Sequence, residues 1–282
     1  MPEVEALAGF LGERLTGRVV ARVDVAGIAA LKTYEPPVTS LGGLGISDVT
    51  RRGKFLDIDV DGLHLVVHLG RAGWVRWRES LPPTPLKPGK GPIVLRVHLD
   101  DGSGLDVTEA GTKRKVAVYV VRDPADVPGV ARLGPDPLTL TRARFDELLD
   151  EHPRTQLKGL LRSQSVIAGI GNAYSDEILH VARLSPFALA GRLDGEGRDR
   201  LFKAIGTTLR EATDRSVGLP ASDLKDDKRA AMRVHGRTGE PCPACGDVVR
   251  EVSFADSSLQ YCATCQTGGK PLADRRMSRL LK

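Results

Sequence analysis

The chain has 282 residues, of which 41% are hydrophobic, a composition that supports folded domains and excludes wholesale disorder. Its length allows two domains, or one domain with appendages. Lys and Arg outnumber Asp and Glu by 41 to 36, a surplus that fits a polyanionic partner without identifying one. The first five residues are acidic where a signal peptide is basic, and no apolar run reaches membrane-spanning length. We therefore expect a cytosolic protein with no membrane partner.

The first half of the chain combines one helical segment with many short alternating segments. Apolar residues recur at helical spacing over residues 4–15, and Gly17 suits the C-terminal cap of that helix. The pattern then changes to period two, with turns such as Asp61-Gly62. The expected strands cover residues 18–26, 55–60, 63–69, 74–78, 93–99, 105–108 and 116–121. Short strands without intervening helices predict an antiparallel β-sandwich with a flanking helix, and not a Rossmann sheet.

The second half of the chain returns to the helical period after a proline-rich linker. The linker prolines are Pro124, Pro128, Pro135 and Pro137, and the expected helices cover residues 145–150, 155–163, 172–181 and 198–215. From Pro220 the chain is polar and basic and then reaches a cysteine cluster. These changes predict an α+β multidomain chain with a β-domain at 1–122, a helical domain at 123–218 and a small metal module at 219–282.

All the cysteines of the chain lie in that last module. They are Cys242, Cys245, Cys262 and Cys265. Two Cys-x-x-Cys pairs, separated by sixteen residues, offer four thiolates to one tetrahedral ion. Residues 248–254 and 259–261 are expected to form a β-hairpin between them. A redox pair would need a βαβ context, and two disulfides would contradict a cytosolic compartment. The spacing therefore predicts one structural Zn²⁺ that folds a ribbon without taking part in chemistry.

A glycine-rich turn precedes the helix expected at 172–181. Gly169 and Gly171 allow close approach of a ligand to the backbone, and Asn172 is expected to cap the helix. The free N–H groups at a helix N-terminus form a phosphate-binding site. A tight turn between packed helices is the other interpretation, and this segment alone slightly favours that turn.

Several segments together point to a known family. They are the opening Met1-Pro2-Glu3, Arg52-Gly53-Lys54, His68-Leu69-Gly70-Arg71-Ala72-Gly73, Gly171-Asn172, and His235-Gly236-Arg237-Thr238-Gly239-Glu240-Pro241-Cys242. In this order, and over nearly the whole chain, the sequence resembles the formamidopyrimidine-DNA glycosylase / endonuclease VIII family. The resemblance implies a catalytic β-sandwich, a DNA-binding helix-two-turn-helix domain and a zinc ribbon. It also implies a bacterial-type cytoplasmic monomer that associates with the nucleoid when it binds damaged double-stranded DNA.

The resemblance implies a base-excision-repair glycosylase with AP-lyase activity on oxidised bases. Pro2, exposed by removal of Met1, would attack C1′ of the damaged nucleotide and form a Schiff base, and Glu3 would transfer protons. An α-amine has a pKa of about 7.7–8.0, against about 10.4 for lysine, so it is the more available nucleophile at neutral pH. Lys54 corresponds to the lysine that the family assigns to strand cleavage by elimination, although an ordinary surface lysine would look the same.

The family's DNA contacts also correspond to residues of this chain. The damaged nucleotide would leave the base stack and enter a cleft between the two large domains. Lys158, Gly171, Asn172 and Arg237 would bind phosphates, and Arg71 would fill the gap left in the duplex.

The sequence departs from the family at three places. It opens Met-Pro-Glu-Val-Glu, whereas the family opens Met-Pro-Glu-Leu-Pro-Glu-Val-Glu, so either three residues are missing after the catalytic pair or the chain starts three residues late. Residues 109–115 replace Asp-Pro-Arg-Arg-Phe-Gly, so that Lys113, Arg114 and Lys115 keep the charge without the aromatic side chain. Ser257 stands where many members have a ribbon arginine. Basic residues that either replace this charge or form a solvated tail are Lys270, Arg275, Arg276, Arg279 and Lys282.

Two other functions compete with a bifunctional glycosylase. A catalytically weak relative that binds damaged or abasic DNA is favoured by the altered start, by the missing ribbon arginine and by the loss of the family's arginine beside the aromatic residue in the segment at 109–115. A zinc-ribbon protein of RNA or the ribosome is disfavoured by the combined N-terminal and helical motifs.

Overall fold

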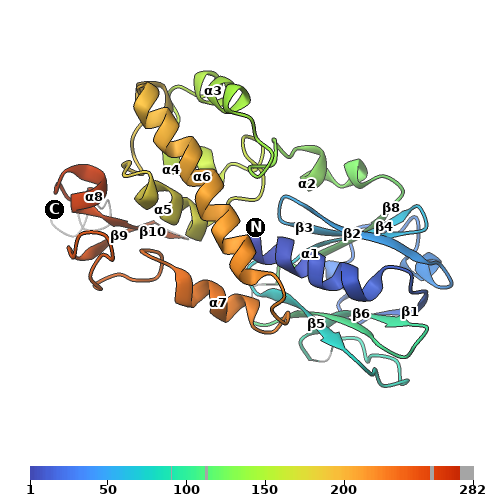
Figure 1. Cartoon of the computed structure of the whole chain (residues 1–282). Helices are drawn as coiled ribbons and strands as arrows, with labels where there is room; N and C mark the ends of the chain where they lie inside the picture. The colour runs from blue at the N-terminus through green and yellow to red at the C-terminus, as the bar shows by residue number, and fades with distance from the viewer. Residues whose placement is uncertain (90, 112–113, 255–256, 274–282) are drawn as a thin grey trace. The chain divides into compact units, whose positions relative to one another are not determined.

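The computed structural model describes residues 1–89, 91–111, 114–254 and 257–273. The predictions that concern Lys113, Arg275, Arg276, Arg279 and Lys282 lie outside the described residues. The chain forms two compact units (Figure 1). The β unit comprises Glu3–Arg132 and Ser216–Leu224, and the helix–ribbon unit comprises Met1–Pro2, Leu133–Arg215 and Lys225–Lys282. The division into three domains at residues 122 and 218 stays a prediction.

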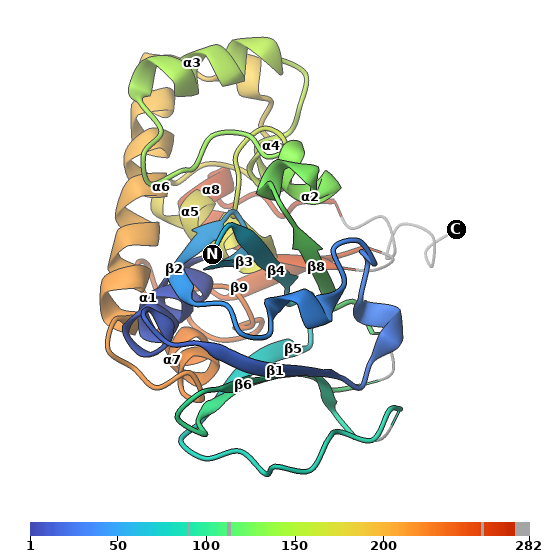
Figure 2. The ribbon, with the colours of Figure 1, turned by 90° about the vertical axis from the view of Figure 1, so that its right-hand side faces the viewer.

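Two four-stranded sheets form the β unit, and every neighbouring pair of strands is antiparallel (Figure 2). One sheet has the order β1 (Val20–Val25), β6 (Ile93–Leu99), β7 (Gly104–Glu109), β5 (Gly73–Arg78). The other has the order β2 (Ile46–Arg52), β3 (Phe55–Val60), β4 (Leu63–His68), β8 (Ala117–Val121). The predicted antiparallel sandwich is confirmed.

Helix α1 (Pro2–Leu15) supplies its apolar stripe to the core of this sandwich. Leu7, Leu11 and Leu15 are fully buried and belong to one cluster with residues of both sheets. The helix ends before Gly17, which has a positive φ of 83°, a conformation that glycine adopts without steric cost. The predicted flanking helix is therefore confirmed.

Strand β2 (Ile46–Arg52) was not predicted from the sequence. Its only buried residues are Ile46 and Val49, three positions apart. An irregularity in the pairing with β3, between Ile46 and Asp48, shifts the register. A bulge of this kind adds a residue on one strand, so the alternation that identifies a strand is lost at this place.

The proline-rich segment is not the plain linker that the sequence predicted. It contains a 3₁₀ turn η3 (Pro124–Asp126) and a short helix α2 (Pro128–Ala131), each with proline at its start. Val127 is fully buried in a small cluster with Val66 and Val121 of the β unit. Proline at the first helical position preorganises φ without losing a hydrogen bond, so these prolines begin packed elements.

Helix α7 (Leu224–Ala231) starts at the last residue of the β unit and continues into the helix–ribbon unit. The helices that precede it in the helix–ribbon unit are α3 (Arg142–Glu151), α4 (Leu157–Arg162), α5 (Asn172–Val181) and α6 (Gly195–Ser216). Phe145, Leu160, Ile178 and Leu209 are fully buried in their common core, which confirms the predicted helical domain. Helix α7 was not predicted, because Leu224 is its one buried residue among charged neighbours.

The ribbon consists of β9 (Val249–Ser253), β10 (Ser258–Cys262) and the short helix α8 (Ala263–Thr267). The two strands pair antiparallel, with Val252 opposite Leu259, as the sequence predicted. Val252, Leu259 and Tyr261 form a buried cluster, and Phe187 packs against it. Within the ranges that the structure describes, no helix has the length and apolar character of a membrane span.

Candidate functional site

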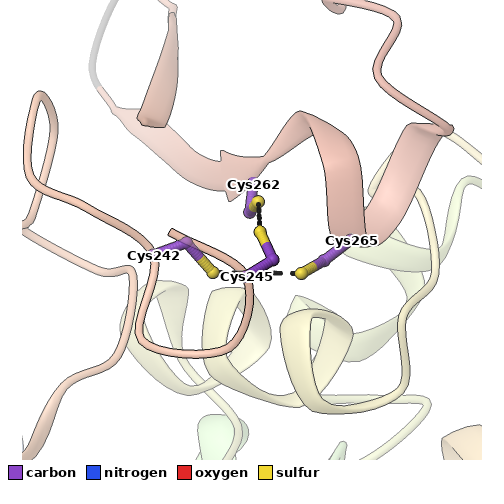
Figure 3. Close-up of side chains that lie close together, drawn as sticks. All are labelled: Cys242, Cys245, Cys262 and Cys265. Atoms are coloured by element: carbon purple, nitrogen blue, oxygen red, sulfur yellow. Dashed lines mark hydrogen bonds between the residues drawn. The ribbon is translucent and has the colours of Figure 1, made fainter. Parts of the chain in front are cut away.

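The four cysteines converge at one point of the ribbon (Figure 3). Their sulfurs all lie within 4.8 Å of one another. The Sγ atoms of Cys245 and Cys262 are 3.4 Å apart, and those of Cys242 and Cys265 are 3.9 Å apart. Sulfurs that surround one zinc ion at about 2.3 Å have separations of this size. The residues present therefore fit a tetrahedral zinc site in which protein ligands take all four positions.

Burial keeps part of the cysteine cluster in the thiol form until a metal ion displaces the protons. Burial raises the pKa of Cys262 to about 11 and raises the pKa of Cys265 as well. The backbone N–H of Asp247 lowers the pKa of the exposed Cys245. Buried thiols of this kind stay protonated at neutral pH unless a metal stabilises the thiolate. Thiolate is the ligand type that selects zinc among the common divalent ions.

Glu177 of α5 connects the helices to the segment that leads into the ribbon. Its side chain is buried. Its two carboxylate oxygens accept hydrogen bonds from the backbone N–H groups of Arg233, Val234 and His235 at 2.8, 2.9 and 2.9 Å. Sequence reasoning missed this residue. The signal in the sequence was that Glu177 lies next to the apolar Ile178 in the predicted helix. A carboxylate buried at such a position needs several hydrogen-bond donors.

The sequence predicted that Asn172 caps α5, and this prediction is wrong. Gly171 occupies the N-cap position without a side-chain bond, and Asn172 is the first helical residue. The Asn172 Nδ2 instead donates to the carbonyl of Ser258 in β10, at 2.8 Å. Its buried Oδ1 has no hydrogen-bond partner among the described residues. The side chain is therefore committed to the ribbon strand, since cap geometry would have turned its oxygen to the helix N–H groups.

The glycine-rich turn before α5 is held by Gln164. The Gln164 Oε1 accepts from the N–H of Gly169 at 3.0 Å, and its Nε2 donates to the carbonyl of Ile170 at 2.8 Å. Gly169 has a positive φ of 81°, which disfavours any other residue there. The turn is thus shaped independently of a ligand, and the N-terminal N–H groups of α5 follow directly after it.

Lys158 is buried beneath this turn and is only 6% exposed. Its Nζ donates to the carbonyl of Asn172 at 2.9 Å and to Asp176 Oδ1 at 2.6 Å. Burial lowers the pKa of Lys158, while the carboxylate of Asp176 acts in the opposite direction. The other oxygen of Asp176 lies 2.7 Å from His235 Nδ1. The structure thus gives Lys158 a role in holding the turn, and its predicted phosphate contact stays a prediction.

Arg237 lies in the approach to the ribbon and uses all its guanidinium nitrogens nearby. Its Nε and Nη2 donate to the carbonyls of Met232 and Ala230, both at 3.1 Å. Its Nη1 donates to Glu240 at 2.9 Å. A phosphate contact by Arg237 stays a prediction. To bind a phosphate, the guanidinium group would have to give up one of these hydrogen bonds or share its donor with the phosphate.

In the β unit, Lys54 occupies the hairpin between β2 and β3, directly after Gly53 with its positive φ of 60°. The ring of His68, at the end of β4, lies close by. Burial, followed by the positive charge of Lys54, lowers the pKa of His68. The N–H of Gly70 points to His68 Nδ1 at 3.2 Å. The hairpin therefore presents a lysine beside a neutral imidazole, and sequence reasoning assigned no role to that histidine.

Arg71 is exposed in the loop that follows His68. The N–H of Gly73 closes this loop on the carbonyl of Leu69, at 2.9 Å. A Cβ at residue 73 would lie 2.1 Å from that carbonyl oxygen, so only glycine fits. The loop presents the Arg71 side chain to solvent, and the insertion of Arg71 into DNA stays a prediction.

Pro2 and Glu3 form the start of α1. Glu3 is buried, with 6% exposure. Met1 is buried as well and belongs to the core of the helix–ribbon unit, where its side chain packs against Gly169. The nitrogen of Pro2 becomes an amine only after removal of Met1, and the same cleavage would empty the space beside Gly169.

The fold and the metal site define a zinc-finger protein that joins a β-sandwich to a helix-two-turn-helix domain. Three family models match successive parts of the chain: the formamidopyrimidine-DNA glycosylase N-terminal domain at residues 1–115, the formamidopyrimidine-DNA glycosylase H2TH domain at 133–220, and the zinc finger found in FPG and IleRS at 239–268.

Full-length relatives agree with these matches. The formamidopyrimidine-DNA glycosylase of Symbiobacterium thermophilum is 33% identical over 98% of this chain and 92% of its own length, and that of Thermus thermophilus is 35% identical over 95% and 98%. The chain belongs to the formamidopyrimidine-DNA glycosylase family. A formamidopyrimidine-DNA glycosylase-like protein of Mycobacterium tuberculosis is 58% identical over 56% of this chain and 99% of its own.

Solved structures show the same fold. The crystal structure of MutM (Fpg) from Thermus thermophilus superposes with a TM-score of 0.79 at 33% identity, covering 96% of this chain and 99% of that one. Lactococcus lactis Fpg, in complex with DNA that contains an abasic site, superposes with a TM-score of 0.82 at 23% identity, covering 95% and 99%.

Proposed function

We propose that this protein is a base-excision-repair DNA glycosylase with AP-lyase activity, which removes oxidised bases from double-stranded DNA. The observation that carries the proposal is the Pro2–Glu3 pair at the start of α1 in a chain that matches the glycosylase family from end to end. Solved relatives were captured with abasic-site DNA, and MutM with DNA containing carbocyclic 8-oxo-G, which supports a damaged duplex as the partner.

The chemistry begins at the amine of Pro2 after Met1 has been removed. The nitrogen lone pair attacks C1′ of the damaged nucleotide, and the bond from C1′ to the base breaks with its electron pair on the departing base. A proton transferred by Glu3 helps to open the sugar ring and leaves an iminium ion at C1′. Loss of a C2′ proton then expels the 3′ phosphate by β-elimination.

Lys54, which lies in the hairpin between β2 and β3, is our candidate for this last step. Its ammonium group, beside the neutral ring of His68, is a compact positive charge for the phosphate that leaves. The proposed role therefore requires the charge of Lys54 but no nucleophilic attack by it.

The DNA backbone would be bound at the start of α5. The N–H groups of the first turn and the positive end of the helix dipole would attract a phosphate there. The Asn172 side chain links this helix end to β10, so the site is shaped before DNA arrives. Binding energy from such contacts offsets the cost of moving the damaged nucleotide out of the base stack.

Replacing Asn172 by Ala is expected to weaken DNA binding by about 10- to 100-fold, the size of one hydrogen bond to a charged group, because the proposed phosphate contact of the side chain is lost together with its bond to Ser258. The loss should be equal for all sequence contexts, because phosphate contacts carry no sequence information. Fluorescence anisotropy with three unrelated duplexes at several salt concentrations measures both effects. Melting temperature and zinc content serve as controls for the lost bond to Ser258. A loss confined to one sequence context would contradict a phosphate contact.

The direct test of the enzymatic proposal is reduction of the Schiff base. Borohydride, added to the protein with DNA that contains an abasic site, should produce a permanent crosslink, and peptide mass mapping should place it at Pro2. Pro2→Gly keeps an N-terminal amine but makes it primary and changes its geometry, so crosslinking should fall. Lys54→Ala should keep the crosslink and slow strand cleavage.

The other outcomes separate the alternatives. A crosslink at Lys54 would retain the lyase activity and reject Pro2 as its nucleophile. Absence of any crosslink, with abasic DNA still bound, would favour a catalytically weak family member that recognises damage. If a chain extended by the family's three additional residues then formed the crosslink, the start of this sequence would be the reason.

A further inference from the structure

Helix α5 contacts the zinc-finger segment at both of its ends. At the first turn, Asn172 donates to the carbonyl of Ser258 in β10. In the last turn, His180 approaches the zinc ligand Cys242, with its Nε2 at 3.2 Å from the sulfur. Both partners are almost completely buried, with 4% exposure for His180 and 3% for Cys242. The contact is therefore shielded from water, which would otherwise compete for the ring N–H.

The surroundings of the ring indicate the direction of this hydrogen bond. The buried Nδ1 of His180 has no hydrogen-bond partner among the residues that the structure describes. A neutral imidazole has one N–H donor, and burial without a partner is most costly for that donor. The proton is thus best placed on Nε2, where the sulfur accepts it.

Metal loading makes this sulfur a strong acceptor. Four thiolates around one Zn²⁺ leave excess negative charge on the sulfurs, and donors directed at them reduce it. Outer residues of this kind orient the ligands of a metal site and raise its affinity. A cysteine in its neutral thiol form would accept this hydrogen bond only weakly.

We propose that His180 is a positioning residue of the zinc site, whose Nε2–H donates a hydrogen bond to the metal-bound thiolate of Cys242. The bond attaches the first Cys-x-x-Cys turn to the end of α5. It couples zinc binding to the helix that begins at Asn172. Glu177, which accepts three backbone N–H groups of residues 233–235, supports the same junction without touching a sulfur.

The test compares His180→Phe with His180→Gln in the full-length protein. Phe fills the space without a donor, whereas the Gln amide restores one. Competition with a chromophoric chelator should show zinc binding weakened by about 10- to 100-fold in the Phe variant, and most of the affinity regained in the Gln variant. In the cobalt-substituted protein, loss of the bond raises the energy of the sulfur electrons. The sulfur-to-cobalt charge-transfer band should therefore move to longer wavelength for Phe and return for Gln.

Phe187→Leu provides the matched control. Phe187 packs against the buried ribbon cluster of Val252, Leu259 and Tyr261 and belongs to no sulfur contact in that cluster. This variant weakens packing, so it should leave the wavelength of the cobalt band unchanged. The proposal would be overturned by an equal shift of the cobalt band in Phe187→Leu. It would also be overturned if His180→Phe changed neither the wavelength of the band nor the zinc affinity.

A measurement on the unaltered protein covers the case in which His180→Phe does not fold. With ¹⁵N-labelled histidine and ¹¹³Cd in place of zinc, the His180 ring should be protonated at Nε2 and show coupling to cadmium through the sulfur. A ring protonated at Nδ1 alone, without coupling, would reject the hydrogen bond.

Discussion

Glu3→Gln is expected to lower the rate of base release by about 10²- to 10⁴-fold, the usual contribution of a positioned acid or base. The amide keeps the shape of the side chain, which is 6% exposed, but it can neither deliver nor take up the proton that opens the sugar. Single-turnover kinetics on a duplex with one oxidised base measure this step. DNA affinity should change little, because Glu3 is assigned to proton transfer and not to phosphate binding.

Glu5→Gln is the matched control for this variant. Glu5 lies on the same helix, two residues further on, and forms an ion pair with Arg51. The substitution removes the same charge without removing the proposed proton donor, so base release should stay near that of the unaltered protein. Equal losses in the two variants would mean that net charge or helix stability, and not proton transfer, explains the effect of Glu3.

Cys262→Ala is expected to have the largest effect on folding. Cys262 is fully buried and supplies one of the four sulfurs within 4.8 Å of one another. Structural zinc contributes about 10–16 kcal/mol of apparent binding energy in small zinc-finger domains, and that energy is also folding energy. The zinc content should fall from one ion per chain to almost none, and the ribbon should unfold.

Metal analysis and limited proteolysis measure this outcome, with cleavage expected inside residues 239–268. DNA binding should fall as well, because the ribbon strand β10 holds Asn172 through the carbonyl of Ser258. Ser253→Ala, at the end of β9 in the same ribbon, should keep zinc and resist protease. A Cys262→Ala protein that keeps its metal, or whose ribbon stays protected without it, would contradict a structural zinc.

The sequence by itself determined the elements whose signals are local. Strand β3 (Phe55–Val60) and helix α5 (Asn172–Val181) have the predicted bounds, because the spacing of apolar residues directly reports the face that a strand or helix buries. The zinc site followed from two Cys-x-x-Cys pairs, since each pair already fixes two ligands to one ion. The family resemblance needed only motifs in their order.

Elements with weak local signals were not predictable. Strand β2 loses its alternation at a register shift, and α7 buries only Leu224. Strand β2 is held by its pairing with the adjacent strand β3. Leu224 packs in the core of the β unit, against residues from the first half of the chain. Tertiary packing of this kind overrides local propensity.

The partners of polar side chains were decided by the tertiary structure alone. Asn172 was expected as a cap and instead bonds to β10. Lys158, whose expected phosphate contact stays a prediction, is buried against Asp176. His180 had no sequence signal for its place beside Cys242, 62 residues away. Most buried polar atoms find a partner wherever folding brings one within reach, and the spacing of residues along the chain does not show which groups come that close in space.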